Sequence, residues 1–363
     1  MKNELQPIAQ IEAFQQTILK WFQENKREMP WRRNPLPYYI WVSEIMLQQT
    51  RVDTVIPYFQ RFIEKYPDVE ALSKAKEEEL LKLWEGLGYY NRARNLKIAA
   101  EEIMTKHQGA LPKTYEALRG LKGIGEYTAG AIASEAFGEK EIAVDGNVFR
   151  VMARLLGCKE DLKNIQVIKE LKREVRRLLP EKEVGDFNQG LIELGALICL
   201  PNGTPKCWQC PVKKVCTAYK EDLQLEIPKK TQKKKRREEE KTVLIFRHGK
   251  TFGLRKREEG KLLAGLYEFY HEEGHLSFEE ALAYVEKMGL KVKSLVALKD
   301  KKFLFTHITW QLKAYMVDLA SPMEGLLFVS KEEIISTYSL ATAFRDYFET
   351  ICHREEAQEE KER

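Results

Sequence analysis

Hydrophobic residues recur every three or four positions through much of the first 222 residues. The segments IEAFQQTILKWF at 11–22 and VIPYFQRFIEKY at 55–66 both show this spacing, which is typical of helices with one buried face. Helix-stop signals, GLG at 86–88 and GALP at 109–112, separate the helical segments. The pattern predicts an all-α domain over residues 1–225.

The pattern changes after this domain. Residues 226–241 include the charged run KKTQKKKRREEEK, which has nothing to bury and predicts a linker. Short runs of β-forming residues (TVLIF, KFLFTHITW and LKAYMVDL) then surround one helical segment, FEEALAYVEKMG. They predict an α+β domain over residues 242–352. The last residues, HREEAQEEKER at 353–363, are expected to form a disordered tail.

Composition narrows the setting of these domains. A chain of 363 residues is long enough for two domains with separate cores, and 44% hydrophobic with 32% charged residues is ordinary for a soluble protein. The chain has no run of 18 apolar residues and no apolar segment in MKNELQPIAQ at its start. We therefore expect no membrane partner and a cytoplasmic, bacterial-type location with the nucleoid. A net charge of +5 permits a polyanionic partner without requiring one.

Four cysteines lie close together near the end of the helical domain, with the spacing C-x7-C-x2-C-x5-C: Cys199, Cys207, Cys210 and Cys216. In a reducing compartment such a group is expected to bind a metal. The run has one C-x2-C pair and no histidine, and a proline follows Cys210, which favours a four-iron cluster over zinc. Scattered reduced thiols are the remaining alternative, and Cys158 and Cys352 are too distant to belong to the group.

A second group of residues suggests contact with a phosphate backbone. The segment LRGLKGIGEYTA at 118–129 has the form of two helices joined by a tight turn. Gly123 and Gly125 would leave the amides at the start of the second helix open to a phosphate, although a purely structural turn would need the same glycines. Asp145 follows 20 residues after Gly125, directly before the helical segment GNVFRVMARLLG. Its simplest role is to cap that helix, which leaves its carboxylate ionised.

A single acid also interrupts an apolar helix. Glu44 lies in IWVSEIMLQQT at 40–50. Burial among these neighbours would raise its pKa, so that the carboxyl could hold a proton near neutral pH. A structural glutamate in an ion pair is the alternative explanation from these residues alone.

Several longer blocks carry a family resemblance. With the hairpin, Asp145 and the cysteine group, they resemble the helix-hairpin-helix DNA glycosylases, in the iron–sulfur branch that includes endonuclease III and the MutY family of adenine glycosylases. The similarity covers nearly the whole first domain, and WVSEIMLQQT is the MutY signature. The blocks are PWR at 30–32, WVSEIMLQQT at 41–50, GLGYYNRARNL at 86–96, GEYTAGAIAS at 125–134 and FNQGLIELGALIC at 187–199.

The resemblance implies a chemistry. Tyr127 stands where endonuclease III-type enzymes have the lysine that forms a Schiff base, so strand cleavage is not expected. Glu44 would protonate adenine, at N7 by resemblance, and ionised Asp145 would stabilise positive charge at C1′ of the sugar. Tyr127 and Asn147 would orient these two groups.

The resemblance also implies how DNA is bound. Gln49 and Tyr89 would enter the gap left by the flipped base, and Arg32 and Gln189 would approach the adenine. Three residues would lie against the opposite base: Gln48, Thr50 and Leu87. Phosphates would meet the hairpin amides and three basic side chains: Arg92, Arg94 and Lys122.

The last domain resembles the Nudix-like domain with which MutY proteins recognise 8-oxoguanine. The markers are KLLAGLYEF at 261–269 and FTHITW at 305–310, and Thr306 and His307 are the candidates for contacting the lesion. Of the carboxylates that hold magnesium in Nudix hydrolases only Glu286 is present, so a binding module is expected. The implied cofactor is a [4Fe–4S] cluster. The implied partner is double-stranded DNA with A·8-oxoguanine or A·G mispairs, bound by a monomer.

Two departures from the family and three alternatives accompany this prediction. Seven residues instead of six separate Cys199 from Cys207, and LAGLYEF replaces LAGLWEF. The alternatives are a glycosylase/lyase for oxidised pyrimidines, which Tyr127 disfavours, a DNA-binding protein without catalysis, and a nucleotide hydrolase, which the missing carboxylates disfavour.

Overall fold

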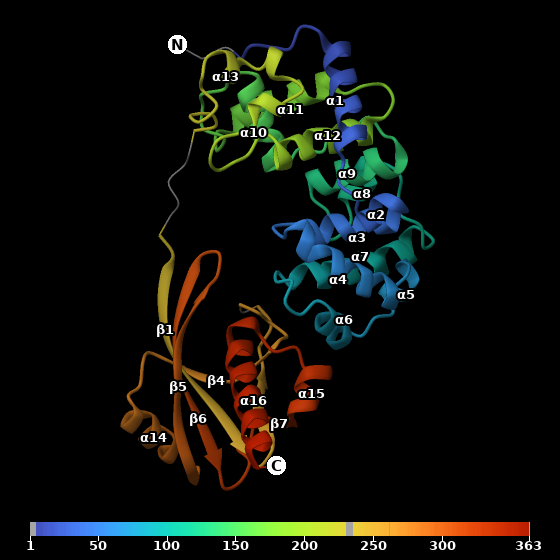
Figure 1. The fold of residues 1–363 in the computed structure, drawn as a ribbon. Helices are drawn as coiled ribbons and strands as arrows, with labels where there is room; N and C mark the ends of the chain where they lie inside the picture. Colours follow the sequence, from blue (N-terminus) through green and yellow to red (C-terminus); the bar gives the residue numbers. More distant parts are fainter. Residues whose placement is uncertain (1–4, 230–234, 261, 363) are drawn as a thin grey trace. The chain divides into compact units, whose positions relative to one another are not determined.

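The computed structural model describes residues 5–229, 235–260 and 262–362. They form two compact units (Figure 1). Residues 1–75 and 91–232 make the first, and residues 76–90 and 233–363 make the second. The expected architecture, a helical domain followed by an α+β domain, is confirmed.

The first unit is built from helices. They are α1 (Ile11–Asn25), α2 (Pro30–Arg33), α3 (Pro37–Leu47), α4 (Val52–Lys65), α5 (Val69–Ser73), α7 (Asn91–Lys106), α8 (Tyr115–Arg119), α9 (Glu126–Phe137), α10 (Gly146–Leu155), α11 (Ile165–Leu178), α12 (Val184–Leu197) and α13 (Thr217–Lys220), with 3₁₀ turns at Cys207–Gln209 and Lys213–Val215. One apolar core joins α1, α10, α11 and α12 through side chains such as Phe22, Leu171 and Phe187. Burial of these apolar faces stabilises helices that would be marginal alone.

Helix α12 lies at the centre of this unit because two of its glycines let other helices approach closely. A side chain at Gly195 would meet Cβ of Asn147 on α10 at 2.6 Å, and one at Gly185 would meet the backbone of Glu135 on α9 at 2.8 Å. Real Cβ atoms do not make such contacts, so any larger residue would push the helices apart. The three helices can therefore bring their side chains together at one site.

Arg92 has a structural role rather than the predicted phosphate contact. It is 8% exposed, and its Nη1 donates to the carbonyl oxygens of Ile45, Met46 and Gln48 at 2.8–2.9 Å. These carbonyls end α3 and have no partner within the helix. Arg92 therefore fixes the end of α3. Arg94 and Lys122 face solvent more openly, and their phosphate contacts stay predictions.

The second unit contains a mixed β-sheet and helices. Its elements are α6 (Glu77–Leu83), β1 (Arg237–His248), β2 (Thr251–Lys256), β3 (Tyr267–Glu268), β4 (Tyr270–Glu273), α14 (Phe278–Lys287), β5 (Val292–Leu304), β6 (Ile308–Leu319), β7 (Leu327–Ser330), α15 (Lys331–Ser336) and α16 (Thr342–Glu362). The sheet order is β3-β2-β1-β6-β5, with β4 paired to β1 and β7 to β2. Strands β1 and β6 are parallel and the other pairs are antiparallel.

Helices cover both faces of the sheet. On one face, Ala281 and Val285 of α14 pack with Phe246 of β1. On the other, Phe348 of α16 lies 5.6 Å from the ring of Phe252 on β2. Because successive strand residues point to opposite faces, the alternating apolar positions of β1 and β6 serve both layers.

Three boundaries differ from the sequence prediction. Residues 237–241, predicted as linker, belong to β1 and pair with β6, and Lys241 is buried with its ammonium 5.0 Å from the ring of Trp310. Residues 353–362, predicted as a disordered tail, continue α16, because Glu, Ala, Gln, Lys and Arg all favour helix. Residues 76–90, predicted in the first domain, group with the second unit.

Polar contacts explain the grouping of residues 76–90. The ammonium of Lys82 donates to the carbonyl oxygens of Ile334 in α15 at 2.8 Å and of Tyr338, just after α15, at 3.2 Å. Glu85 accepts from the backbone amide of Leu340 at 2.9 Å. The segment that carries Tyr89 is thereby attached to the second unit.

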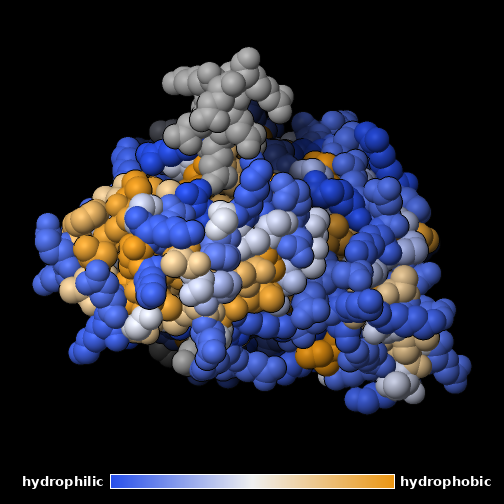
Figure 2. Space-filling model, turned by 90° about the horizontal axis from the view of Figure 1, so that it is seen from below, coloured by the Kyte–Doolittle hydropathy of each residue, from blue (hydrophilic) through white to orange (hydrophobic). Residues whose placement is uncertain are grey.

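The surface fits the composition. The face in Figure 2 is largely hydrophilic, and its hydrophobic residues gather in separate patches. Within the described parts of the chain, no helix combines the length and apolarity needed to cross a membrane.

Candidate active site

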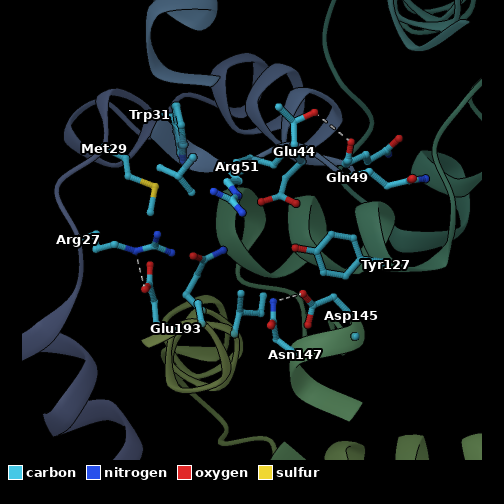
Figure 3. Close-up of a pocket in the computed structure, with 18 of the residues that line it drawn as sticks. Arg27, Met29, Trp31, Glu44, Gln49, Arg51, Tyr127, Asp145, Asn147 and Glu193 are labelled. Carbon is cyan, nitrogen blue, oxygen red and sulfur yellow. Dashed lines mark hydrogen bonds and ion pairs between the residues drawn. The ribbon is translucent and has the colours of Figure 1, made fainter. Parts of the chain in front are cut away.

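A pocket of about 770 Å³ opens in the first unit where α2, α3, α9, α10 and α12 meet (Figure 3). Nine of the residues singled out from the sequence line it: Arg32, Glu44, Gln48, Gln49, Thr50, Tyr127, Asp145, Asn147 and Gln189. They come from segments up to 157 positions apart. The fold therefore brings the expected catalytic and base-contacting residues of the helical domain into one place.

Glu44 is a buried acid of the pocket. It lies on α3 with 4% exposure, and burial raises its pKa to about 7, against a hydrogen bond from Tyr127 that lowers it. Its Oε2 is buried and has no hydrogen-bond partner among the described residues. A buried carboxyl oxygen without a partner is costly. The site therefore favours a protonated Glu44 or a ligand that binds this oxygen.

Asp145 caps α10 as expected. Its Oδ1 accepts from the backbone amide of Val148 at 2.9 Å, and its Oδ2 accepts from Nδ2 of Asn147 at 2.7 Å. Burial raises the pKa of Asp145, and these hydrogen bonds act in the opposite direction. In Figure 3 Asp145, Tyr127 and Glu44 border the same space. Two carboxyl groups with different surroundings thus share one pocket.

Arg150 links this acid to the cysteine loop. Its Nη2 donates to Oδ1 of Asn147 at 2.8 Å, and its Nε donates to the carbonyl oxygen of Cys199 at 2.7 Å. The guanidinium also donates to the carbonyl oxygen of Gly195 at 2.9 Å. A fork of five donors suits such a junction, so the position of Asn147 depends on α12 and on the first cysteine.

Another wall of the pocket is formed by a network of charged side chains. Arg32 donates to Glu193 at 2.7 Å and Arg27 donates to the other oxygen of that carboxylate at 2.9 Å. A second nitrogen of Arg32 binds Oε1 of Gln189. Glu193 is 1% exposed, so the two guanidinium groups converge on a buried carboxyl group. Arg32 and Gln189 therefore have fixed positions in the wall.

The rim of the pocket is formed by the loop after α3. Gln48 donates to the hydroxyl of Thr128 at 3.3 Å, and Gln49 is exposed with a φ of 59°. A non-glycine residue with positive φ is uncommon and often marks a functional site. The exposed Gln49 side chain lies at the pocket rim, and its role as a wedge stays a prediction.

The predicted hairpin is present between α8 and α9. Gly123 has a φ of +80°, and a side chain there would meet Cβ of Asn95 at 2.7 Å. Gly125 caps α9 without a side chain and has no atom within 4 Å of the Cβ position. The first amides of α9 therefore face an open surface, and phosphate binding there stays a prediction.

The four clustered cysteines converge without forming a disulfide. Burial raises the pKa of Cys210 and Cys216, and the thiols of Cys199 and Cys207 add to it. Arg154 donates to Sγ of Cys199 at 3.2 Å. In the described residues no three His, Cys, Asp or Glu side chains are grouped for a single metal ion. A four-iron cluster needs a wider spacing, because each thiolate binds a different iron.

The remaining expected residues lie in the second unit. The hydroxyl groups of Tyr89 and Thr306 lie 3.1 Å apart, and Tyr89 is 45% exposed with a φ of 50°. His307 is exposed beside Thr306. Leu87 is only 5% exposed because it packs within the fold, which does not support its predicted contact with the opposite base. The wedge candidate and the lesion-contacting candidate are thus neighbours.

Two family models match the chain. Residues 42–177 match the helix-hairpin-helix superfamily of base excision DNA repair proteins, and residues 242–350 match the NUDIX domain. An adenine DNA glycosylase of Buchnera aphidicola is 34% identical over 307 residues, which are 84% of this chain and 87% of that protein. The chain belongs to the adenine DNA glycosylase family.

Other members and neighbours agree with this family. The human adenine DNA glycosylase is 42% identical over 220 residues, covering 58% of this chain and 40% of that protein. A thermostable thymine-DNA glycosylase superimposes with a TM-score of 0.53 at 32% identity, and an endonuclease III–DNA covalent intermediate with 0.51 at 26%. These structures cover 58% and 59% of this chain and 97% of their own. Membership in the adenine DNA glycosylase family confirms the predicted monofunctional DNA glycosylase of base excision repair.

Other residues of the family site were missed from the sequence. They line the pocket or support it: Arg27, Met29, Arg51, Arg150, Ile192 and Glu193. Glu193 and Arg27 are 166 positions apart, and no local pattern reveals such a pair. The signal that could have found Glu193 is its place in α12, where an acid interrupts the apolar run GLIELGAL.

Proposed function

We propose that this protein excises adenine paired with 8-oxoguanine or guanine by hydrolysing its N-glycosidic bond. The observation that carries the proposal is Glu44, a buried carboxyl in a pocket shared with Asp145, whose Oε2 lacks a hydrogen-bond partner among the described residues. Adenine leaves poorly unless its ring is protonated, and a buried carboxyl near neutrality is a suitable proton donor.

The target base must first leave the duplex. Flipping it out of the stack costs a few kcal/mol, which contacts in the pocket and the filled gap offset. A pocket of about 770 Å³ has room for a purine and part of its sugar. Gln49, exposed at the rim, fills the gap, and Arg32 and Gln189 bind the base.

Protonation and bond cleavage follow. Neutral Glu44 transfers its proton to N7 of adenine, and the electron pair of the N-glycosidic bond leaves with the base. The sugar becomes an oxocarbenium ion, and the Asp145 carboxylate stabilises the charge at C1′. Two hydrogen bonds hold the carboxyl groups in place. Tyr127 is hydrogen-bonded to Glu44, and Asn147 donates to Asp145.

Water completes the reaction. The ionised Glu44 accepts a proton from a water molecule while the water oxygen bonds to C1′. This step restores the protonated Glu44 and leaves an abasic site. General acid–base catalysis contributes about 10²–10⁴-fold to such a step. No amine of the lyase type stands at position 127, so the strand is left intact.

Recognition of the opposite base needs the second domain. Adenine is a normal base, so selectivity has to come from its partner. Thr306 and His307, on the turn between β5 and β6, contact 8-oxoguanine. Tyr89, which is hydrogen-bonded to Thr306, enters the duplex beside the 8-oxoguanine. Glu286 on α14 is the only retained Nudix carboxylate of its motif, and the domain acts in binding.

The cysteine group holds a [4Fe–4S] cluster. Cys199, Cys207, Cys210 and Cys216 supply the thiolates, and they suit iron because they are near one another and unpaired. The cluster supplies structural cross-linking when bound. A bound cluster would fix the position of Cys199. The carbonyl oxygen of Cys199 accepts from Arg150, and Arg150 in turn holds Asn147.

The experiment compares Thr306→Ala with the wild type on A·8-oxoguanine and A·G duplexes. We expect the preference for A·8-oxoguanine to fall about tenfold, since one buried hydrogen bond is worth about 1–1.5 kcal/mol. Thr350→Ala, on α16, is the matched control and should keep the preference. Unchanged discrimination in the Thr306 variant would refute the assigned recognition.

A further inference from the structure

A half-buried acid next to the pocket has no part in the mechanism. Glu135 lies on α9 and accepts a hydrogen bond from Nε2 of Gln189. It does not line the main pocket but a second hollow of about 470 Å³, whose walls also include Arg32 and Gln189. Glu135 therefore contacts Gln189 from the second hollow and not from the pocket of the predicted base.

The two ends of the Gln189 amide have different partners. Arg32 donates to its Oε1, and its Nε2 donates to Glu135. The reversed amide would set its NH₂ group against the Arg32 guanidinium and its carbonyl oxygen against the Glu135 carboxyl. The NH₂ group facing Arg32 repels in every protonation state, and the oxygen facing Glu135 repels when that carboxyl is ionised, so Arg32 and Glu135 together favour one orientation of the amide.

A fixed amide matters for reading adenine. An Asn or Gln amide pairs with adenine through one donor and one acceptor, on the exocyclic amine and a ring nitrogen. With Arg32 and Glu135 bound, each end of the Gln189 amide keeps one further hydrogen-bonding position for a ligand. A rotating amide would present the wrong group to the base for part of the time.

The close approach of two helices places Glu135 there. Gly185 of α12 lies against the backbone of Glu135, where a Cβ would come within 2.8 Å. Burial raises the pKa of Glu135, and nearby Glu44 adds to this while the bond from Gln189 and the charge of Arg32 oppose it. A carboxyl oxygen can accept from Nε2 in either protonation state, so the contact does not depend on ionisation.

We propose that Glu135 is a positioning residue for adenine selectivity, which acts by holding the Gln189 amide in the orientation that recognises the exocyclic amine. The inference rests on the proposed excision of adenine. It assigns to Glu135 an effect on which base is accepted, separate from the proton transfer by Glu44.

The test uses Glu135→Met, Glu135→Gln, Gln189→Met and the Glu135→Met/Gln189→Met double variant. Methionine matches glutamate in length and helix preference but accepts no strong hydrogen bond, whereas glutamine keeps an acceptor oxygen. Single-turnover rates are measured with adenine, and with purine that lacks the exocyclic amine, opposite 8-oxoguanine. The readout is the adenine-to-purine rate ratio, and thermal unfolding monitors the fold.

We expect Glu135→Met to lower this ratio about tenfold, the effect of one lost hydrogen bond, and Glu135→Gln to stay within about threefold of wild type. In the double variant the ratio should equal that of Gln189→Met, because residues acting through one contact are not additive. A wild-type ratio in Glu135→Met, or a further fall in the double variant, would overturn the inference. Failure of the wild type to release adenine would instead overturn the proposed function.

Discussion

Nε of Arg150 donates to the carbonyl oxygen of Cys199 at 2.7 Å, while Nη2 of the same side chain holds Asn147 at 2.8 Å. The first cysteine of the cluster loop and the partner of the catalytic acid are therefore attached to one guanidinium. A disturbance of the loop reaches Asp145 through three hydrogen bonds, which join Cys199 to Arg150, Arg150 to Asn147, and Asn147 to Asp145. We therefore expect the cysteine loop to affect catalysis without touching the substrate.

Replacement of Arg150 by Gln should impair both stability and rate. The variant loses several hydrogen bonds from a charged donor that is 8% exposed, each worth about 1.5–3 kcal/mol. We expect the free energy of unfolding to fall by about 2 kcal/mol and single-turnover excision to slow by about 10–100-fold. Arg173→Gln, on the exposed side of α11, is the control, and equal rates in the two variants would exclude the link.

Asp145 allows capping to be separated from catalysis. Asn caps a helix as well as Asp does, so Asp145→Asn should keep the stability of wild type and lose nearly all excision. Asp145→Ala should lose excision as well and also about 1 kcal/mol of unfolding free energy. Chemical denaturation and single-turnover kinetics measure the two effects. Full activity in the Asn variant would show that the carboxylate has only the structural role.

The rate should fall on the alkaline side with the ionisation of Glu44. Burial raises its pKa to about 7, and only the protonated form can donate a proton to adenine. Above that pH we expect single-turnover excision to fall about tenfold per pH unit. A plateau from pH 7 to pH 9 in the pH–rate profile would contradict general acid catalysis by Glu44.

The same ionisation affects stability. The pKa of Glu44 is higher in the folded than in the unfolded chain, so the folded state binds more protons between about pH 4.3 and pH 7, and stability falls as pH rises through this window. Glu44→Gln removes the ionisation. This variant should be inactive. Its free energy of unfolding relative to that of wild type should be about 1–3 kcal/mol more favourable at pH 8 than at pH 4.5. Equal stability changes at both pH values, by denaturant titration, would exclude a buried ionising Glu44.

Loss of a cluster ligand should release iron. Cys210→Ser is expected to lower the iron and acid-labile sulfide content of the purified protein severely and to reduce excision, since binding of the cluster is coupled to the fold of the loop. Cys158→Ser, a buried thiol outside the group, should keep both. Iron retained at wild-type level in the Cys210 variant would refute the ligand assignment.

Much of the site could be predicted from local sequence. The apolar neighbours of Glu44 predicted its burial, the segment DGNVF predicted the cap by Asp145, and the glycine pair at 123 and 125 predicted the hairpin. Each of these depends on residues a few positions away. Short-range patterns in the chain are sufficient for such features.

Features made by contacts distant in sequence could not be predicted. Arg92 resembles a surface cation in GLGYYNRARNL, yet it ends α3 some 46 positions earlier. The acids Glu135 and Glu193 gain their roles from Gln189 and Arg32, which only the folded chain brings near. The charged residues at the start of β1 predict a linker, because nothing within this segment indicates that it pairs with β6.

The most direct test of the central claim is single-turnover excision on four duplexes: adenine opposite 8-oxoguanine, opposite guanine and opposite thymine, and thymine glycol opposite adenine. Each reaction is divided into a half treated with alkali and an untreated half. We expect strand breaks at adenine opposite 8-oxoguanine and guanine only after alkali, with A·T intact. Breaks at thymine glycol without alkali, or no product from protein that binds the duplexes, would contradict it.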